Sequence, residues 1–470
     1  MGRKRRGITA GLTAGLLGAL LAVPVPGVSA GANPGVDASA SAVAGVNARK
    51  DPVLPRYGTT KIDVRHYALD LTWAPATKRL TGTAKLTIKA RQALTSFPLS
   101  LHGMSVKGVT TAGQKATFTR SGDRLTIKPH QRITKGTVFT TQISYSGKPK
   151  YLFGAEGTSE GWLPTARGAV ALGEPVGSMT WFPLNNTPRD KATYLIAVTV
   201  PERLTAVSNG RLISNTTSPT GRTWRWKMNK PMAGYLATVA VGDYRRTTMT
   251  KQGIRYDSFV AKAASPNKKA LKLLPKVIAQ QQKWFGPHPF RDAGILVDLP
   301  RVRYALETQT RSFFPMFADE MTLVHEVAHQ WYGNSVTPAT WRDIWLNEGF
   351  ATYAEWLWTA KHGGPTPAKQ LRKHYKTVAW RPAPRGITIT TLFSDPVYIR
   401  GAMTLQVIRE RIGRPAFFKV LRAWAKQNQY GTVSTRDFKA LVERISGKQV
   451  DDIFRDWLNT PKRPSAKYVK

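Results

Sequence analysis

The chain contains 470 residues, of which 70 are Lys or Arg and 28 are Asp or Glu, so its formal net charge is +42. This length exceeds what a single hydrophobic core usually supports and therefore predicts two domains. The sequence has no cysteine, which excludes disulfide bonds, thiolate metal ligands and thiol oxidation from its chemistry.

Residues 1–30 are predicted to be a signal peptide. Basic residues at positions 3 to 6 precede a weakly apolar stretch from Ile8 to Val25, and Ala30 ends a small-residue cleavage site. The alternative is a retained membrane anchor, but glycines and two prolines interrupt the apolar stretch. We therefore expect a secreted, extracellular protein.

Residues 31–57 are rich in Gly, Ala, Ser and Pro and show no periodicity, which is typical of a flexible linker. Between residues 58 and 246, apolar and polar residues alternate over several segments. This alternation predicts an N-terminal antiparallel β domain. The clearest alternating segments are residues 67–73, 85–90 and 194–200.

Helical signals dominate residues 247–464. Ser265 and Pro266 can begin a helix, and Gly286 followed by proline can end it. Ser434 and Asp437 have the spacing of a capping box at the start of a later helix. The second domain is therefore predicted to be mostly helical, and the chain to have an α+β fold.

The second domain contains the segment HEVAHQWYGNSVTPATWRDIWLNEGF, residues 325–350. On a helix, His325 and His329 lie on one face and can bind the same metal ion. Glu348 is placed to supply a third ligand, and Glu326 is placed to act as a general base. These ligands leave the fourth tetrahedral position of a zinc ion open for water, which is typical of a catalytic site. We predict one Zn2+ per chain; the alternative is that both histidines are ordinary core or surface residues.

The segments HEVAH, QWYGNSVT and WRDIWLNEGFATY resemble the zinc aminopeptidases of the aminopeptidase N family. In that family the second histidine and the glutamate ligand are separated as His329 and Glu348 are. The resemblance extends from about Lys61 to Pro464 and implies a thermolysin-like catalytic domain. The chain ends soon after the resemblance does, so we expect a short form that lacks the C-terminal helical domain of larger relatives. Residues 465–470 are expected to be a polar tail.

The resemblance also implies residues that bind the amino terminus of a substrate. Tyr304 to Thr308 stand in the place of the family's GAMEN-type edge strand, and Glu307 matches its glutamate. Glu174, in the β domain, resembles a second acid that reaches the same amine pocket. Taken singly, each glutamate is more often a solvated surface residue. Two converging acids would fix the scissile bond one residue from the amino terminus.

Tyr398 lies in a segment similar to the family's YxKGA motif, with Arg400 where lysine is more common. The resemblance implies that its hydroxyl donates a hydrogen bond to the developing oxyanion, whereas an isolated tyrosine here would be assigned to the core. Glu326 is then expected to take a proton from the attacking water and pass it to the leaving amine.

The predicted function is hydrolysis of the N-terminal peptide bond of peptides that have a free amino terminus. Two alternatives stay open. One is a thermolysin-like endopeptidase. The other is a basic protein that binds anionic cell-wall polymers or membrane surfaces, with weak or no peptidase activity. The basic residues are scattered and no nucleic-acid-binding motif accompanies them, so no specific nucleic acid partner is expected.

Overall fold

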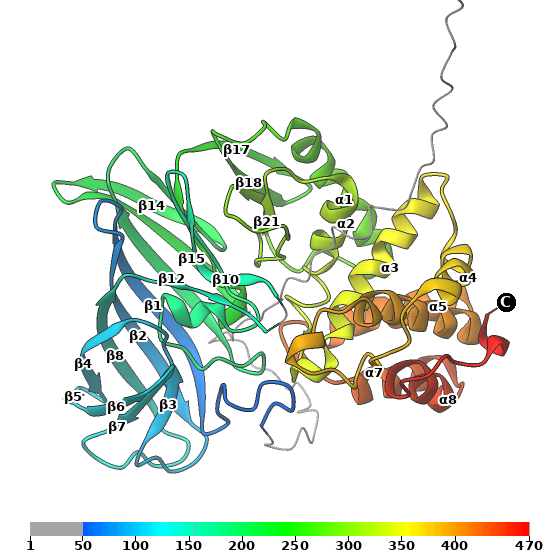
Figure 1. Ribbon diagram of the computed structural model, residues 1–470, viewed down its shortest axis with the longest axis horizontal. Coiled ribbons are helices and arrows are strands. Elements are labelled where there is room, and N and C mark those ends of the chain that lie inside the picture. Colours follow the sequence, from blue (N-terminus) through cyan, green and yellow to red (C-terminus); the bar gives the residue numbers. More distant parts are fainter. Residues whose placement is uncertain (1–49, 156, 470) are drawn as a thin grey trace, which may run out of the picture.

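The computed structural model describes residues 50–155 and 157–469 and shows two domains side by side (Figure 1). Strands dominate the N-terminal part and helices the C-terminal part, as the sequence predicts. The predicted signal peptide lies outside the described residues. Within them, no helix combines the length and the apolar character needed to cross a membrane.

The largest sheet of the N-terminal domain has eight strands in the described part of the chain. In β1, Tyr67 and Leu69 are buried, whereas Asp70, the residue after Leu69, is exposed. Successive side chains of a strand point to opposite faces of the sheet, which explains this alternation. All three segments that alternate in the sequence form strands of this sheet. Its spatial order is β14 (Arg211–Ser218), β15 (Gly221–Ala233), β12 (Lys191–Val200), β1 (Ile62–Ala74), β2 (Arg79–Ala90), β8 (Val138–Gly147), β4 (Ser105–Thr111) and β5 (Gln114–Lys115).

One pair in this sheet departs from the predicted antiparallel arrangement. β1 and β12 run parallel, with Tyr67 opposite Tyr194. Parallel neighbours need a long crossover connection, and here the chain passes through β2 to β11 before it returns as β12. The alternation of apolar and polar residues does not encode strand direction, so the sequence could not show this.

Two smaller sheets complete the N-terminal domain. The ring of Trp73 on β1 lies 5.1 Å from that of Trp162 on β10, which packs the second sheet against the first. The second sheet contains β13 (Thr205–Ser208), β16 (Val239–Gly242), β11 (Gly168–Leu172), β10 (Ser159–Thr165) and β9 (Tyr151–Phe153). The third contains β3 (Phe97–Ser100), β7 (Arg124–Lys128) and β6 (Thr117–Ser121).

The C-terminal domain begins with a sheet rather than with helices. It contains β17 (Tyr244–Lys251), β18 (Ile254–Ala261), β20 (Ile295–Asp298) and β21 (Ser312–Pro315), with β19 (Asp292–Ala293) also paired to β18. One helix, α1 (Lys268–Phe285), lies between β18 and β19. The helices that follow the sheet are α2 (Glu320–Ala328), α3 (Trp345–Lys361), α4 (Pro367–Thr377), α5 (Gly401–Ile412), α6 (Arg414–Gln427), α7 (Thr435–Ser446) and α8 (Asp451–Phe454). In Figure 1 this sheet lies at the top of the molecule, with α1 and α2 beside it and α3 nearer the C-terminal helices.

The helix boundaries follow local chemistry. α1 begins within two residues of the predicted Ser265-Pro266 start and ends at the predicted Gly286. α7 has the predicted capping box: the Ser434 hydroxyl accepts from the Asp437 backbone N–H, and the Asp437 carboxylate accepts from that of Ser434. These ends could be read from sequence because each depends on neighbouring residues alone.

Buried cationic side chains join the two domains. The Lys191 ammonium on β12 donates to the Ser335 and Gly431 carbonyls and to the Thr337 hydroxyl, at 3.0 to 3.2 Å. Arg311, which is fully buried, donates to the carbonyl of Asp257 at 2.8 Å and also to that of Ser208 in the N-terminal domain. Because a buried donor is costly without a partner, these bonds fix the relative position of the domains.

Two predictions about the chain ends are wrong for the described residues. In the predicted linker, Asp51 is buried and accepts a hydrogen bond from the Trp341 backbone N–H of the other domain at 2.8 Å. In the predicted polar tail, Tyr468 is buried, and its hydroxyl donates to Asp452 and Asp456. Composition alone could not show either contact, because the partners are distant in sequence.

Candidate active site

The structure brings His325, His329 and Glu348 together in one buried cluster. His325 lies in the last turn of α2, and His329 is the residue that caps the end of this helix. Glu348 lies in the first turn of α3. The Nε2 atoms of His325 and His329 lie 3.3 and 3.4 Å from the same carboxylate oxygen of Glu348. One potential ligand atom from each residue lies within 4.8 Å of the others, so a single ion can contact all three.

The other ring nitrogen of each histidine has an acceptor. His325 Nδ1 lies 2.6 Å from Glu355 of α3, and His329 Nδ1 lies 3.1 Å from the Tyr332 carbonyl. We assign the ring proton to Nδ1 in both, because each partner can only accept. Each Nε2 atom then faces a carboxylate oxygen of Glu348, and this contact is favourable when a cation, either a metal ion or a second ring proton, lies between them. The residues therefore fit a zinc ion, with oriented histidines and an acid as its ligands.

Two further acids lie beside these ligands. Atoms of Glu307, Glu326 and His329 also lie within 4.8 Å of one another, and all three residues are buried. Burial, partly offset by His329, raises the pKa of Glu307 to about 7. Burial, partly offset by His325, raises that of Glu326 to about 8. Acids so crowded are stabilised by any cation that enters the site.

Glu307 reaches the cluster from an irregular segment rather than from a regular strand. Of residues 304–308, only Leu306 forms a β bridge, with Phe313 of β21, so the expected edge strand is reduced to a single bridge. The Asn334 side chain donates to the Glu307 carbonyl at 2.7 Å and holds the segment against the turn that follows α2. The Glu307 carboxylate is 1% exposed and accepts no hydrogen bond from the described residues.

Glu174 comes from the other domain, directly after β11, and is also 1% exposed. Its charge acts on Tyr398: burial, followed by the proximity of Glu348, Glu174 and Glu307, holds the pKa of Tyr398 well above its ordinary value. The structure thus places the acid from the N-terminal domain at the same site as Glu307.

Tyr398 lies on a short π-helical segment, Pro396–Arg400, just before α5. Its ring stacks on that of His325 with centroids 6.0 Å apart, and its hydroxyl has no partner among the described residues. A close helix contact brings it there: a Cβ on Gly349 would lie 2.8 Å from the backbone of Gly401. The glycine that follows Glu348 therefore allows α3 to approach the segment that carries Tyr398.

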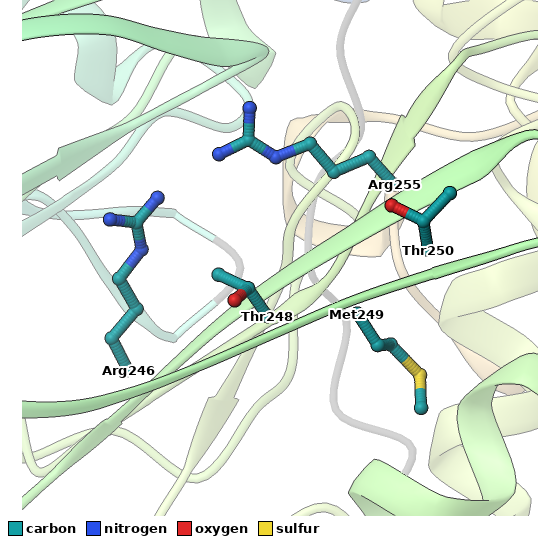
Figure 2. A pocket seen from close by; sticks show the side chains of 5 residues that line it. All are labelled: Arg246, Thr248, Met249, Thr250 and Arg255. Atoms are coloured by element: carbon teal, nitrogen blue, oxygen red, sulfur yellow. The ribbon is translucent and has the colours of Figure 1, made fainter.

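A separate hollow of about 390 Å³ lies on the β17–β18 hairpin. Figure 2 shows the Arg246 and Arg255 guanidiniums on the same side of this hairpin, with Thr248 between them and Met249 on the other face. Arg246 forms an ion pair with Asp257 at 2.7 Å. None of the residues that line this hollow belongs to the histidine and acid cluster.

Comparison with protein families assigns both domains. The family model for the Peptidase M1 N-terminal domain matches residues 64–236, and that for the Peptidase family M1 domain matches residues 305–457. The second match contains all three candidate metal ligands. The chain belongs to the M1 family of zinc metallopeptidases.

Curated M1 relatives are longer than this chain. Aminopeptidase M1-D of Oryza sativa subsp. japonica is 28% identical over 324 residues, which cover 62% of this chain and 36% of that protein. Aminopeptidase N of Streptomyces lividans is 27% identical over 310 residues, which cover 58% of this chain and 36% of that protein. The match thus spans about a third of each relative's length.

A solved M1 structure matches almost from end to end. The M1 zinc metallopeptidase from Deinococcus radiodurans is 28% identical, with a TM-score of 0.81 over 88% of this chain and 98% of that one. A mutant of that enzyme has been solved with a Tyr-Ser-Ala substrate and gives a TM-score of 0.80 at 29% identity. This M1 chain therefore shares a two-domain architecture with a solved relative.

Glu355 belongs to this candidate site, although the sequence analysis had not suggested it. It lies seven residues after Glu348, two helical turns further along the same face of α3, and contacts His325. Helical spacing could have placed it near the metal ligands. Spacing could not select it among the other residues of α3, because the contact depends on how α2 packs against α3.

Proposed function

We propose that this M1 chain is a zinc-dependent aminopeptidase that hydrolyses the N-terminal peptide bond of peptides. One observation carries the proposal: the buried carboxylate of Glu307, which accepts no hydrogen bond from the described residues, lies within 4.8 Å of Glu326 and His329. The ionised form of a buried acid of this kind is stabilised by a cationic partner, and the amino terminus of a peptide is a cation.

The metal would be held by His325, His329 and Glu348. When bound, zinc lowers the pKa of a water molecule and polarises a carbonyl group. Glu355 and the Tyr332 carbonyl keep the histidine rings oriented for this purpose.

Each remaining residue then has one task. Glu326 accepts the proton of the attacking water and later gives it to the leaving amine, for which its raised pKa suits it. Tyr398 stays protonated because its pKa is raised, and its hydroxyl donates to the oxyanion that develops on the carbonyl. Glu307 and Glu174 bind the ammonium group of the substrate and set the distance to the scissile bond.

A thermolysin-like endopeptidase is the alternative, and the same substrate tested in two forms distinguishes them. An aminopeptidase cleaves a peptide with a free amino terminus and leaves its acetylated form almost intact, because acetylation removes the charge that Glu307 binds. Equal cleavage of both forms would show an endopeptidase. A panel of aminoacyl reporters would then identify the preferred first residue.

The metal requirement has its own test. Chelation by phenanthroline is expected to abolish cleavage, and added Zn2+ is expected to restore it. Metal analysis of the purified protein is expected to give one zinc ion per chain. Full activity in metal-free protein would contradict the proposal.

We also propose that the enzyme acts outside the cell and associates with anionic surfaces. The signal-like residues 1–30 and the net charge of +42 support this. So does the β17–β18 hairpin, where the partly exposed Arg246 and Arg255 share the acid Asp257. Activity found only in the cell interior would contradict the location. Binding to anionic polymer that is unaffected by salt would contradict the electrostatic attraction.

A further inference from the structure

We propose that Tyr235 is a further substrate-binding residue, whose hydroxyl accepts a hydrogen bond from the substrate ammonium beside Glu307 and Glu174. The inference rests on the proposed aminopeptidase function and adds to it a third contact, made by the N-terminal domain. Tyr235 lies on a short 3₁₀ helix, Gly234–Leu236, between β15 and β16.

The backbone of Tyr235 lies against the loop that carries Glu174. A Cβ added to Gly173 would lie 2.3 Å from the Tyr235 carbonyl oxygen, so only glycine permits this approach. Glu174 is the next residue along the chain. The two segments of the N-terminal domain that reach the site are therefore in direct contact.

The same 3₁₀ helix is tied to the segment that carries Glu307. The Asn209 side chain donates to the Leu236 carbonyl at 2.9 Å and to the Gln309 carbonyl at 3.0 Å. In return, the Gln309 side chain donates to the Pro231 carbonyl at 3.1 Å. Gln309 is two residues beyond Glu307, so Tyr235 is held beside both acids.

The tyrosine ring is fixed, but its hydroxyl is not satisfied. The ring packs on Trp341 with centroids 4.5 Å apart, and the residue is 1% exposed. The hydroxyl has no partner among the described residues. Burial, followed by the proximity of Glu174, Glu307 and Glu348, holds the pKa of Tyr235 well above its ordinary value, so the hydroxyl stays protonated in the field of the acids.

Hydrogen-bond chemistry gives this hydroxyl a role. An ammonium group has three N–H donors, and two glutamates leave one of them without a partner. The phenol oxygen can accept from that donor, while its own proton can be donated to a carboxylate. Tyr398 cannot fill this position if it serves the oxyanion, because it stacks on the metal ligand His325. The two tyrosines thus contact opposite ends of the same substrate residue.

The test is Tyr235→Phe, which keeps the ring and removes only the hydroxyl. Tyr194→Phe is the matched control, since Tyr194 is equally buried and its hydroxyl also lacks a partner among the described residues, but it lies in the core of the N-terminal domain. Kinetics on an aminoacyl 4-nitroanilide give kcat and KM. Calorimetry on Glu326→Gln protein, with an amino acid amide and its deaminated counterpart, gives binding without turnover.

We expect Tyr235→Phe to lower kcat/KM by about tenfold to a hundredfold, mainly through KM, as for the loss of a hydrogen bond to a charged group. Binding of the amino acid amide should weaken by a similar factor and that of the deaminated amide should not change. Tyr194→Phe should match the wild type in both assays, and both variants should unfold near the wild-type temperature.

Two results would overturn the inference. Kinetics and amide binding of Tyr235→Phe equal to those of Tyr194→Phe would show that Tyr235 only packs against Trp341. A fall in kcat with unchanged amide binding would place the hydroxyl on the reacting carbonyl instead. If the wild-type protein itself fails to prefer the free amine over the acetylated substrate, the proposed aminopeptidase function is wrong, and the inference is wrong with it.

Discussion

The two halves of the candidate site are built in different ways. The metal half, His325, His329 and Glu348, comes from α2 and α3 of one domain, within 24 residues of sequence. The amine half combines Glu307 of that domain with Glu174 of the other, and 132 positions separate them in sequence. The first half is a local motif, whereas the second exists only when the domains pack together.

The difference shows how this protein combines general chemistry with selectivity. Helix packing alone forms the metal half, which can support hydrolysis of any polarised carbonyl. The amine half depends on interdomain bonds such as those of Arg311 and Asn209, and under the proposed function it determines which carbonyl reaches the metal. Changes in the first half should therefore affect all substrates, and changes in the second only those with a free amino terminus.

The largest expected effect is that of Glu326→Gln. Loss of the general base should lower kcat by about 10² to 10⁴ on every substrate, while zinc content stays at the wild-type level. Glu320→Gln, at the start of the same helix, is the control and should keep full activity, because an amide oxygen can still accept from Trp358. An active Glu326→Gln protein would show that another group takes the proton.

Glu307→Gln tests the amine half. Its carboxylate is buried, so removal of its charge should cost about 3–5 kcal/mol with substrates that have a free amino terminus, or about two to three and a half decades in kcat/KM. Slow cleavage of acetylated peptides and zinc content should not change. Equal losses on free and acetylated peptides would mean that Glu307 belongs to the metal half.

The packing behind the metal helix should depend on pH. His288 contacts Trp331, just beyond α2, and burial lowers its pKa to about 4, against an ordinary value of 6.5. The folded state favours neutral His288. This residue therefore adds to the free energy of unfolding above pH 6.5, and that addition, up to about 3 kcal/mol, is lost as the pH falls towards 4. Urea unfolding of wild type and His288→Asn across this range should differ by this amount. Identical pH profiles would contradict the prediction.

The smallest expected effect is that of Glu355→Ala, which acts on the metal half through His325. Loss of an acceptor for a ligand histidine typically weakens metal affinity by about 10- to 100-fold. Competition with a chelator should show weaker zinc binding, and activity should recover at saturating zinc. Glu355→Gln, which keeps an acceptor oxygen, should lie nearer the wild type. Zinc affinity unchanged in Glu355→Ala would show that Tyr332 and the helix packing orient the rings without it.

The sequence predicted the β and helical domains, the capping box of α7 and the metal motif, each of which rests on residues close together in the chain. It missed the parallel pairing of β1 with β12, the docking of Asp51 and Tyr468, and the contact between Glu355 and His325. These features join segments that are separate in sequence. Helical periodicity and strand alternation indicate which face of an element is buried, but not which partner covers it.

By itself, the sequence determined that two imidazoles and a carboxylate can share one ion, because helix geometry puts residues four apart on one face. The family resemblance implied that Glu307 and Glu174 converge, but only the tertiary structure showed the contacts that hold them, together with Tyr235, beside the metal ligands. Their positions depend on close backbone approaches and on hydrogen bonds across a domain interface, and these form only when the whole chain has folded.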